Sequence, residues 1–344
     1  MLGDKKILSL QILEILKKHS DVKNKLSQTD IKNYLEQEYE QVGIDGRTIN
    51  ANIDLLNDFF GDVIQYETKD VESKGSTIEK KYNYYIERDF DDSELRLLID
   101  SVLSSKSIPE HQSEQLIEKL IKEASASFKY KKNIVKKYTS GLKVNDELFT
   151  NIEVLSEAID GNNKVTFKYY DYNIDKELVP RCKDGKERVY KLTPLRMVVN
   201  NGRYYLFGVP DINNNLSIYR IDKIKRAEVL NESGKSKDVI EGLKDGMDLG
   251  KHIAEHIFMT LGPSETIIFE FDSWWISSVI DWFGKDIELT MKDDNTCIGR
   301  VKVNVKSFEN WAMMCSYTGV KVTSPKSVAD DLKKRAQEIA KLYK

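Results

Sequence analysis

The spacing of apolar residues changes at Gly161, and this change limits the folds open to the chain. Before Gly161, apolar residues recur at helical spacing, which predicts amphipathic helices. After it, runs such as Val165-Thr166-Phe167-Lys168-Tyr169-Tyr170 have a period near two, which predicts strands of a small antiparallel sheet or barrel. The sequence therefore predicts an α+β multidomain protein with a helical first half and a β-rich body.

Length and charge set the broad class. The chain has 344 residues, which is long for one core, so two or three domains are expected. The net charge of −3 means that local basic patches must hold any polyanionic partner. No apolar run approaches the roughly 18 residues of a membrane span, and the N-terminus has a helical pattern instead of a cleavable leader. With three scattered cysteines, we expect a reducing, cytoplasmic setting and no membrane association.

Residues 1–90 carry the pattern of a winged helix-turn-helix. Ser27 and Asp30 form a capping-box-like start of the second helix, and Asp45 opens the third after a turn at Gly43. In this motif the third helix enters the major groove, where asparagine pairs with adenine and arginine binds guanine or phosphate. The predicted DNA contacts on its exposed face are Arg47, Thr48, Asn50 and Asn52.

Two features keep an alternative open for this head. Asp54 and Asp58 on the third helix repel phosphate, so an ordinary three-helix packing unit with solvated amides is the other interpretation. Beyond it, Val63–Tyr66 and Tyr82–Ile86 predict two strands around a long lysine-rich loop. Such a loop is either a wing on the phosphate backbone or disordered surface chain. As a wing, its predicted DNA contacts are Lys74 and Lys80.

Residues 91–161 predict a helical linker. One amphipathic helix follows Asp91, a second starts at Pro109, and a third covers Asp146–Ile159. Apolar helix faces without a core of their own need a partner, so we expect a homodimer. Between these helices, the run Phe128–Tyr138 holds five lysines, which form either a phosphate-binding stripe or a solvated connector.

Catalytic and metal-binding signatures are weak. His252 and His256 stand at the spacing of two zinc ligands, but the second position of His-Ile-Ala-Glu-His is not glutamate. No Gly-rich phosphate loop, GxSxG motif or Cys–His pair with an orienting group accompanies them. We expect no enzyme activity, no metal and no cofactor.

The stretch Asn200–Leu230 is the strongest candidate for a binding site. It predicts two strands, Arg203–Pro210 and Leu216–Tyr219, followed by a basic segment. Cations for phosphate alternate here with tyrosine rings for base stacking, which is worth about 1–3 kcal/mol per base. The predicted ligand contacts are Arg196, Arg203, Arg220, Lys223 and Arg226 for phosphate, and Tyr169, Tyr204 and Tyr219 for bases.

Strand alternation limits this set. Tyr204 and Tyr205 are neighbours on one predicted strand and face opposite sides, so one of them belongs to the core. We assign Tyr205 to the core and Tyr204 to the site. Asp222, beside Arg220, is predicted to orient that arginine and not to bind ligand.

These residues resemble the WYL domain family. Tyr204-Tyr205-Leu206 stands where the family has Trp-Tyr-Leu, and Tyr219-Arg220-Ile221-Asp222-Lys223-Ile224 is similar to its Phe-Arg-Leu-Asp-Arg-Ile signature. Pro194-Leu195-Arg196-Met197 resembles its Pro-x-Arg-Leu element, and Phe167-Lys168-Tyr169 resembles the end of its opening strand. The order and spacing of these four elements make the resemblance specific.

The resemblance extends in both directions. Arg47-Thr48-Ile49 is similar to the start of the recognition helix in the winged helix-turn-helix that such regulators carry. Residues 266–343 resemble the C-terminal extension that follows many WYL domains, with a βαββα order. The implied domains are a winged helix-turn-helix at 1–90, a helical linker at 91–161, an Sm/SH3-like WYL β-barrel at 162–232 and a C-terminal α/β extension at 233–344.

The resemblance implies a ligand-responsive transcriptional regulator. Such a protein binds double-stranded promoter DNA through its head and senses a nucleotide or single-stranded nucleic acid through the WYL domain. The residues themselves leave a second hypothesis open. This is an RNA- or single-stranded-DNA-binding accessory protein whose head is a protein-interaction module.

Overall fold

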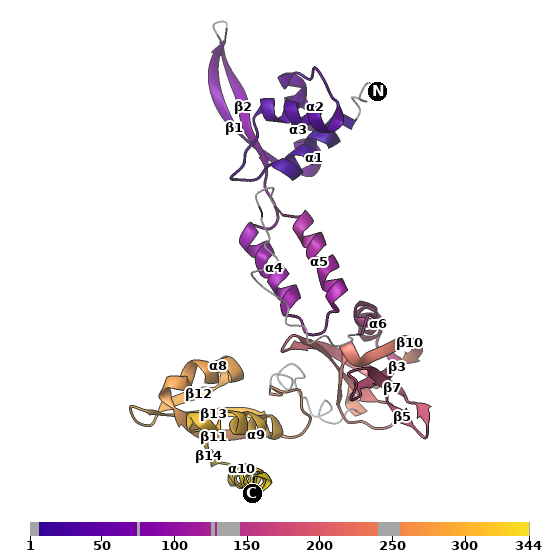
Figure 1. Cartoon of the computed structure of the whole chain (residues 1–344), viewed down its shortest axis with the longest axis vertical. Helices are drawn as coiled ribbons and strands as arrows, with labels where there is room; N and C mark the ends of the chain where they lie inside the picture. The colour runs from indigo at the N-terminus through magenta and orange to yellow at the C-terminus, as the bar shows by residue number, and fades with distance from the viewer. Residues whose placement is uncertain (1–6, 74–75, 125–127, 129–144, 240–254, 344) are drawn as a thin grey trace. The chain divides into compact units, whose positions relative to one another are not determined.

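The computed structural model of the chain describes residues 7–73, 76–124, 128, 145–239 and 255–343. The chain divides into two compact units, Met1–Ser105 with Glu110–Thr139, and Lys106–Pro109 with Ser140–Lys344. Each unit has its own buried apolar clusters, so the elements of each are described separately (Figure 1).

The first unit begins with three helices and a two-stranded hairpin. They are α1 (Leu8–His19), α2 (Gln28–Tyr39), α3 (Gly46–Phe60), β1 (Ile64–Ser73) and β2 (Ser76–Ile86). The helix starts follow the predicted caps, because Ser27 forms a capping box with Asp30, and the Asp45 carboxylate accepts a hydrogen bond from the backbone of Thr48. Tyr84 of β2 is buried in the same cluster as the three helices, and its backbone pairs with Leu26, which anchors the hairpin.

The hairpin strands are longer than the sequence predicted. Pairing continues from Glu67 opposite Tyr82 to Ser73 opposite Ser76, through the stretch expected to be a loop. Backbone hydrogen bonds hold this polar ribbon together although it has no apolar alternation to signal a strand. Lys74 lies outside the described residues. Three helices followed by a hairpin is the element order of a winged helix-turn-helix, and that assignment stays a prediction.

Two further helices, α4 (Asp92–Ser104) and α5 (Glu110–Lys122), follow the hairpin in this unit. Asp91 caps the start of α4 with two backbone hydrogen bonds. Leu95, Ile99 and Ile117 form a small buried cluster between the two helices.

The second unit opens with a helix and a six-stranded antiparallel sheet. Their bounds are α6 (Leu148–Asp160), β3 (Asn163–Tyr172), β4 (Leu178–Pro180), β7 (Val189–Asn200), β8 (Arg203–Pro210), β9 (Ser217–Arg220) and β10 (Ile224–Ser233). The strands pair in the order β10-β3-β7-β8-β9, and β4 pairs with β3. The 3-10 turn η2 (Ile221–Lys223) joins the two edge strands, β9 and β10. Over the residues that the structure describes, these edge strands show no mutual pairing, so hydrogen bonding does not close the sheet into the predicted barrel.

Helix α6 belongs to this sheet, although the sequence assigned it to the linker. Leu155 and Ala158 of α6 are fully buried in one cluster with Val165 of β3. The side-chain amide of Asn151 donates to the backbone carbonyl of Ile224 at 2.6 Å, which ties α6 to the start of β10. The helix therefore covers the apolar face of the sheet.

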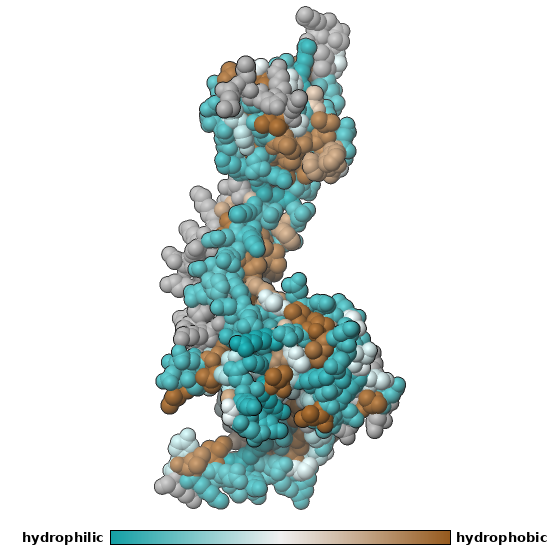
Figure 2. Space-filling view, turned by 90° about the vertical axis from the view of Figure 1, so that its right-hand side faces the viewer, coloured by the Kyte–Doolittle hydropathy of each residue, from teal (hydrophilic) through white to brown (hydrophobic). Residues whose placement is uncertain are grey.

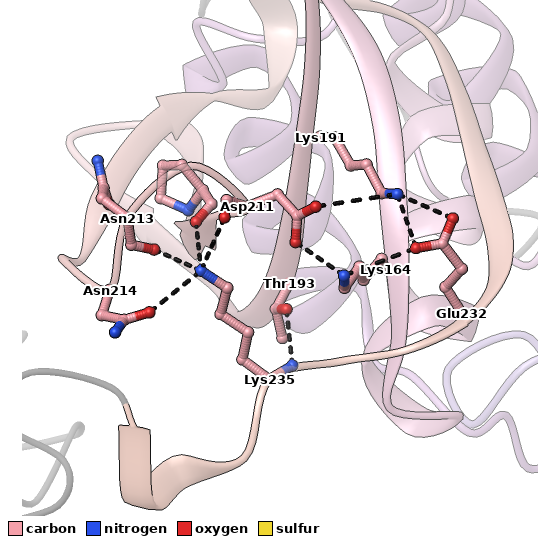
Figure 3. A network of polar contacts seen from close by, with 9 residues as sticks. Lys164, Lys191, Thr193, Asp211, Asn213, Asn214, Glu232 and Lys235 are labelled. Atoms are coloured by element: carbon pink, nitrogen blue, oxygen red, sulfur yellow. Dashed lines mark hydrogen bonds and ion pairs between the residues drawn. The ribbon is translucent and has the colours of Figure 1, made fainter.

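A lysine fixes the chain where it leaves the sheet (Figure 3). The Lys235 ammonium donates to the backbone carbonyls of Pro210 and Asp211 at 2.9 and 3.2 Å. It also donates to the carbonyl of Asn213 and the side-chain oxygen of Asn214. The loop between β8 and β9 thus wraps around a cation supplied by the segment that follows β10.

The C-terminal part of the second unit has its own sheet and core. Its elements are β11 (Ser264–Asp272), α8 (Ile276–Phe283), β12 (Glu288–Met291), β13 (Thr296–Asn304), α9 (Val305–Met314), β14 (Lys321–Ser324) and α10 (Lys326–Leu342). The sheet order β12-β13-β11-β14 with this βαββαβ sequence is ferredoxin-like, and α10 follows it. Phe269 of β11 and Phe308 and Trp311 of α9 lie in the buried core of this part. The sequence predicted the order βαββα, and the structure adds the strand β14 before the last helix. No helix in the described ranges has the length and apolar content to cross a bilayer.

Candidate nucleic-acid interfaces

A buried carboxylate holds two arginines together at the end of β9. Asp222 lies in η2, and its side chain is 2% exposed. Arg220 donates from Nε to one carboxylate oxygen at 3.0 Å and from Nη2 to the other at 2.5 Å. Arg203 on β8 donates to that second oxygen at 3.2 Å. Two guanidinium groups therefore share one carboxylate, which leaves one net positive charge.

The surroundings of Arg220 fix its position and its charge. Burial opposes the charged guanidinium, but the hydrogen bonds and the charge of Asp222 outweigh burial, so the pKa of Arg220 is raised. The side chains of Arg203 and Arg220 are still 27% and 25% exposed. A ligand can therefore reach the N–H groups that Asp222 does not use.

Strand register places a third arginine on the same face of the sheet. Paired residues of antiparallel strands face the same side, as do residues two apart on one strand. Tyr205 pairs with Arg220, and Arg196 pairs with Phe207, two residues beyond Tyr205. Arg196, Arg203, Tyr205 and Arg220 therefore share one face, which we call the arginine face. Arg196 is exposed there.

The tyrosines predicted to stack on bases lie on the opposite face. Tyr169, Tyr204 and Tyr219 pack in the core of the sheet. The hydroxyl of Tyr169 accepts a hydrogen bond from the backbone of Arg220 at 3.1 Å, and burial raises the pKa of Tyr169 to about 12. The assignment of Tyr204 and Tyr205 is therefore reversed. Alternation requires one of them to face inward, and it is Tyr204 that meets the core, whereas Tyr205 faces the arginines.

Lys223 shares a carboxylate with an arginine outside the predicted set. Its ammonium lies 2.7 Å from one oxygen of Asp171, and Arg181 Nε lies 2.5 Å from the other. Burial favours the neutral acid, but both cations outweigh it and lower the pKa of Asp171. Lys223 Nζ is also 5.9 Å from the ring centroid of Tyr172. Burial raises the pKa of Tyr172, and the charge of Asp222 adds to this increase.

Arg181 and Arg188 flank a hairpin and lie on rings of the core. The hairpin strands are β5 (Cys182–Lys183) and β6 (Lys186–Glu187). The guanidinium carbons lie 4.9 Å from the Tyr169 centroid for Arg181 and 4.5 Å from the Tyr190 centroid for Arg188. The signal for this hairpin was present in the sequence as Asp184-Gly185. Both residues have positive φ, of 53° and 74°, as the two-residue hairpin turn requires.

Arg226 stands apart from these groups. It occupies an irregular position of β10 with a φ of 55°, and its backbone N–H donates to the Glu147 carboxylate at 2.7 Å. Its side chain is exposed, but the described residues show no contact between it and Asp222, Arg203 or Arg220. Of the predicted cations, the structure brings Arg203 and Arg220 together on Asp222 and places Arg196 on the same face. It pairs Lys223 with Asp171 and leaves Arg226 outside.

In the head, α3 turns its asparagines inward. Asn50 accepts hydrogen bonds from the Gln28 amide at 2.9 Å and from the buried Tyr84 hydroxyl at 2.7 Å. Asn52 accepts a hydrogen bond from the Ser9 hydroxyl at 2.5 Å. The sequence predicted both amides on the exposed face. They face inward because the polar groups of Gln28, Tyr84 and Ser9 need partners once the helices pack together.

The exposed side of α3 is more apolar than predicted. Arg47 is exposed in the first turn, and Thr48 is half-buried. Leu55 and Phe59, further along the helix, are 59% and 79% exposed. Figure 2 shows hydrophobic surface on this three-helix part of the chain. Of the four predicted contacts on α3, Arg47 is the one with an exposed side chain.

The hairpin has two electrically different faces. Lys69 is directly opposite Lys80, and the next pair is Asp70 opposite Glu79. Successive residues of a strand point to opposite faces, so one face carries the lysine pair and the other the acidic pair. Like charges directly opposite each other destabilise a two-stranded ribbon, so a nearby anion would stabilise the lysine pair.

In the described ranges, no group of three or more His, Cys, Asp or Glu side chains is arranged to hold a metal ion. His252 lies outside these ranges, and His256 is buried.

Comparison with known proteins identifies the region around the arginine face. Residues 150–229 match the WYL domain, so the chain contains a WYL domain that runs from α6 into β10. Among solved structures, the chain is similar to proteasome accessory factor B/C (PafBC) of Arthrobacter aurescens. The identity is 12% and the TM-score 0.27, over 97% of this chain and 48% of that one. The chain thus spans about half the length of PafBC. No curated protein sequence gives a match.

Proposed function

We propose that the chain is a ligand-responsive, DNA-binding transcriptional regulator that senses a nucleotide or single-stranded nucleic acid through its WYL domain. The observation that carries the proposal is the pairing of Arg203 and Arg220 on the buried carboxylate of Asp222. Guanidinium groups bind phosphate oxygens through parallel N–H bonds. A pair that is fixed beforehand loses little side-chain freedom when it binds. Tyr205, on the same face, supplies a ring for one base.

The head supports the DNA-binding half of the proposal. Arg47 at the start of α3 and the pair of Lys69 and Lys80 on the hairpin are the groups proposed to contact duplex DNA. Ligand at the WYL domain would change DNA affinity by favouring one of two placements of the heads in a homodimer. Leu97 on α4 is 68% exposed and supports a dimer contact at the helical linker.

A second candidate function is favoured by the surface of α3. Leu55 and Phe59 present apolar side chains where a DNA-reading helix carries polar ones, and Asp58 beside them repels phosphate. In that case the head is a protein-interaction module. The chain is then an accessory protein that binds RNA or single-stranded DNA through the WYL domain.

Duplex binding separates the two candidates. Fluorescence anisotropy is measured with duplex DNA from upstream of the protein's own gene and with a scrambled duplex, each with and without oligothymidylate. A regulator should prefer its own duplex, and oligothymidylate should change that affinity. Arg47→Gln should weaken duplex binding, and Arg220→Gln should remove the oligothymidylate response. Arg300→Gln, an exposed arginine on β13, is the matched control.

The regulator is rejected if the chain binds the two duplexes with equal affinity, with and without oligothymidylate. If the chain still binds oligothymidylate in that experiment, the result supports the accessory protein instead.

A further inference from the structure

Five cations follow one another along the surface of the WYL domain. Arg203 and Arg220 share Asp222, and Lys223 directly follows Asp222 in the sequence. Lys223 and Arg181 share Asp171, and Arg188 lies at the base of the same hairpin as Arg181. The backbone N–H of Arg188 donates to the Arg181 carbonyl at 2.8 Å. We call this series the cationic ridge.

The Tyr169 side chain contacts one arginine from each part of the ridge. Arg181 lies over its ring, and its hydroxyl accepts a hydrogen bond from the backbone of Arg220. The Arg181 guanidinium and the backbone of Arg220 therefore lie at the ring and at the hydroxyl of one tyrosine. Tyr169 itself is buried, so a ligand would pass from one part of the ridge to the other along Lys223, whose ammonium donates to Asp171.

The ridge has a surplus of positive charge, although the whole chain carries −3. The five cations of the ridge and the two carboxylates of Asp171 and Asp222 together carry a net charge of +3. Glu187 of the hairpin does not reduce this surplus, because it is paired with Lys168. An anion with several charges is therefore the complementary ligand.

The hairpin arginines are held in place before any ligand arrives. Arg181 is restrained by Asp171 and by the Tyr169 ring, yet its side chain is 48% exposed. Arg188 rests on Tyr190 and is exposed. A guanidinium group that lies on a ring loses little freedom on binding, and its outer face stays open to a phosphate or a base.

We propose that the binding site of the WYL domain continues along the β5–β6 hairpin through Arg181 and Arg188, so that its ligand is a single strand with several phosphates and not one nucleotide. A mononucleotide satisfies the Arg203 and Arg220 pair and leaves the hairpin empty. The phosphates of a single strand repeat along its backbone and can meet the cations of the ridge in turn. This inference rests on the proposed function, because it concerns the same site.

The test compares ligands of different length on the full chain. A fluorescein-labelled oligothymidylate of eight nucleotides is bound by anisotropy, and dTMP and oligothymidylates of two and four nucleotides compete with it. Affinity should rise with length. Arg181→Gln and Arg188→Gln should each weaken binding of the longest strand by about fivefold and reduce the slope of log affinity against log salt by about 0.7, while dTMP competes as before. Arg300→Gln should change neither value.

The outcomes separate this inference from the proposed function. If dTMP binds, Arg220→Gln abolishes it, and longer strands bind no better, the proposed site stands and its extension along the hairpin is rejected. The extension is also rejected if the two hairpin variants behave like Arg300→Gln. If neither dTMP nor any strand binds the wild-type chain, the proposed function fails and the inference fails with it.

Discussion

Replacing Asp222 by asparagine tests how the arginine face is built. The carboxylate is 2% exposed and accepts three hydrogen bonds, two from Arg220 and one from Arg203. Asparagine keeps the shape but loses the charge. It also turns an N–H group toward one of the guanidinium groups, so a buried donor faces another donor. The two arginines then repel each other without a counter-charge.

The cost follows from the burial of each partner. Removing one partner of a fully buried ion pair costs roughly 3–5 kcal/mol. Arg203 and Arg220 are about a quarter exposed, so water recovers part of this loss and we expect about 2–3 kcal/mol. The matched control is Asp211→Asn, at the turn residue that directly follows β8. Asp211 is 32% exposed and pairs with Lys164 at 2.7 Å, so its replacement should cost about 0–1 kcal/mol.

Hydrogen–deuterium exchange resolves the effect locally, which suits a chain of several cores. Peptides from β8 and β9 should exchange about 30- to 140-fold faster in Asp222→Asn, since each 1.4 kcal/mol is a factor of about ten. Peptides from β11 and β13 should be unchanged. If β8 and β9 exchange no faster in Asp222→Asn than in Asp211→Asn, the carboxylate does not organise the arginines and the reasoning is refuted.

Three further predictions concern the hairpin of the head, the core of the WYL domain and the segment that follows β10. Lys69→Gln and Lys80→Gln should each lower the slope of log affinity for duplex DNA against log salt by about 0.9, whereas Asp70→Asn on the other face of the hairpin should leave it unchanged. Equal slopes for all three variants would contradict a wing with two electrically different faces. The raised pKa of Tyr169, about 12 in the folded chain, stabilises the fold fully below pH 10, and this stabilisation is lost as pH rises to 12. In urea titrations the wild-type chain should therefore lose about 2–3 kcal/mol of unfolding free energy between pH 10 and 12, and Tyr169→Phe should not show this loss. An equal loss in the variant would contradict the burial of this hydroxyl. Lys235→Met should speed hydrogen–deuterium exchange in residues 210–216 about tenfold, because four oxygen acceptors lose their cation. Unchanged protection would show that the loop is stable without Lys235.

The parts of the fold that depend on local chemistry could be predicted from the sequence. The starts of α2 and α3 follow from Ser27 and Asp45, whose side chains cap backbone groups within three residues. The length of the hairpin strands in the head was underestimated because their outer parts are polar on both faces. Helix α6 was assigned to the wrong neighbour because helical periodicity gives an apolar face but does not say which surface covers it.

The candidate site shows the same limit. The sequence placed Arg203, Arg220 and Asp222 close together because they lie on neighbouring elements of one short stretch. It could not decide between Tyr204 and Tyr205, since alternation fixes only that they face apart. It missed Arg181 because that residue, which lies between β4 and β5, joins the site through an ion pair with Asp171 of β3 that no local pattern shows.

The inward asparagines of α3 restrict how the head can use DNA. The side-chain oxygen of Asn50 accepts hydrogen bonds from Gln28 and Tyr84, so it links α2, α3 and β2. Binding adenine through this oxygen would break those hydrogen bonds and destabilise the head. Arg47 is the only basic residue of α3. Direct reading of bases by this helix would then rest on very few side chains, and each good bidentate contact gives only about 1–3 kcal/mol of discrimination. Most of the affinity for duplex would come from phosphates, through the lysine face of the hairpin, and would weaken with salt. A regulator of this kind gains from an effector that changes the placement of two heads, because the spacing of two weak readers selects a site more sharply than either reader alone.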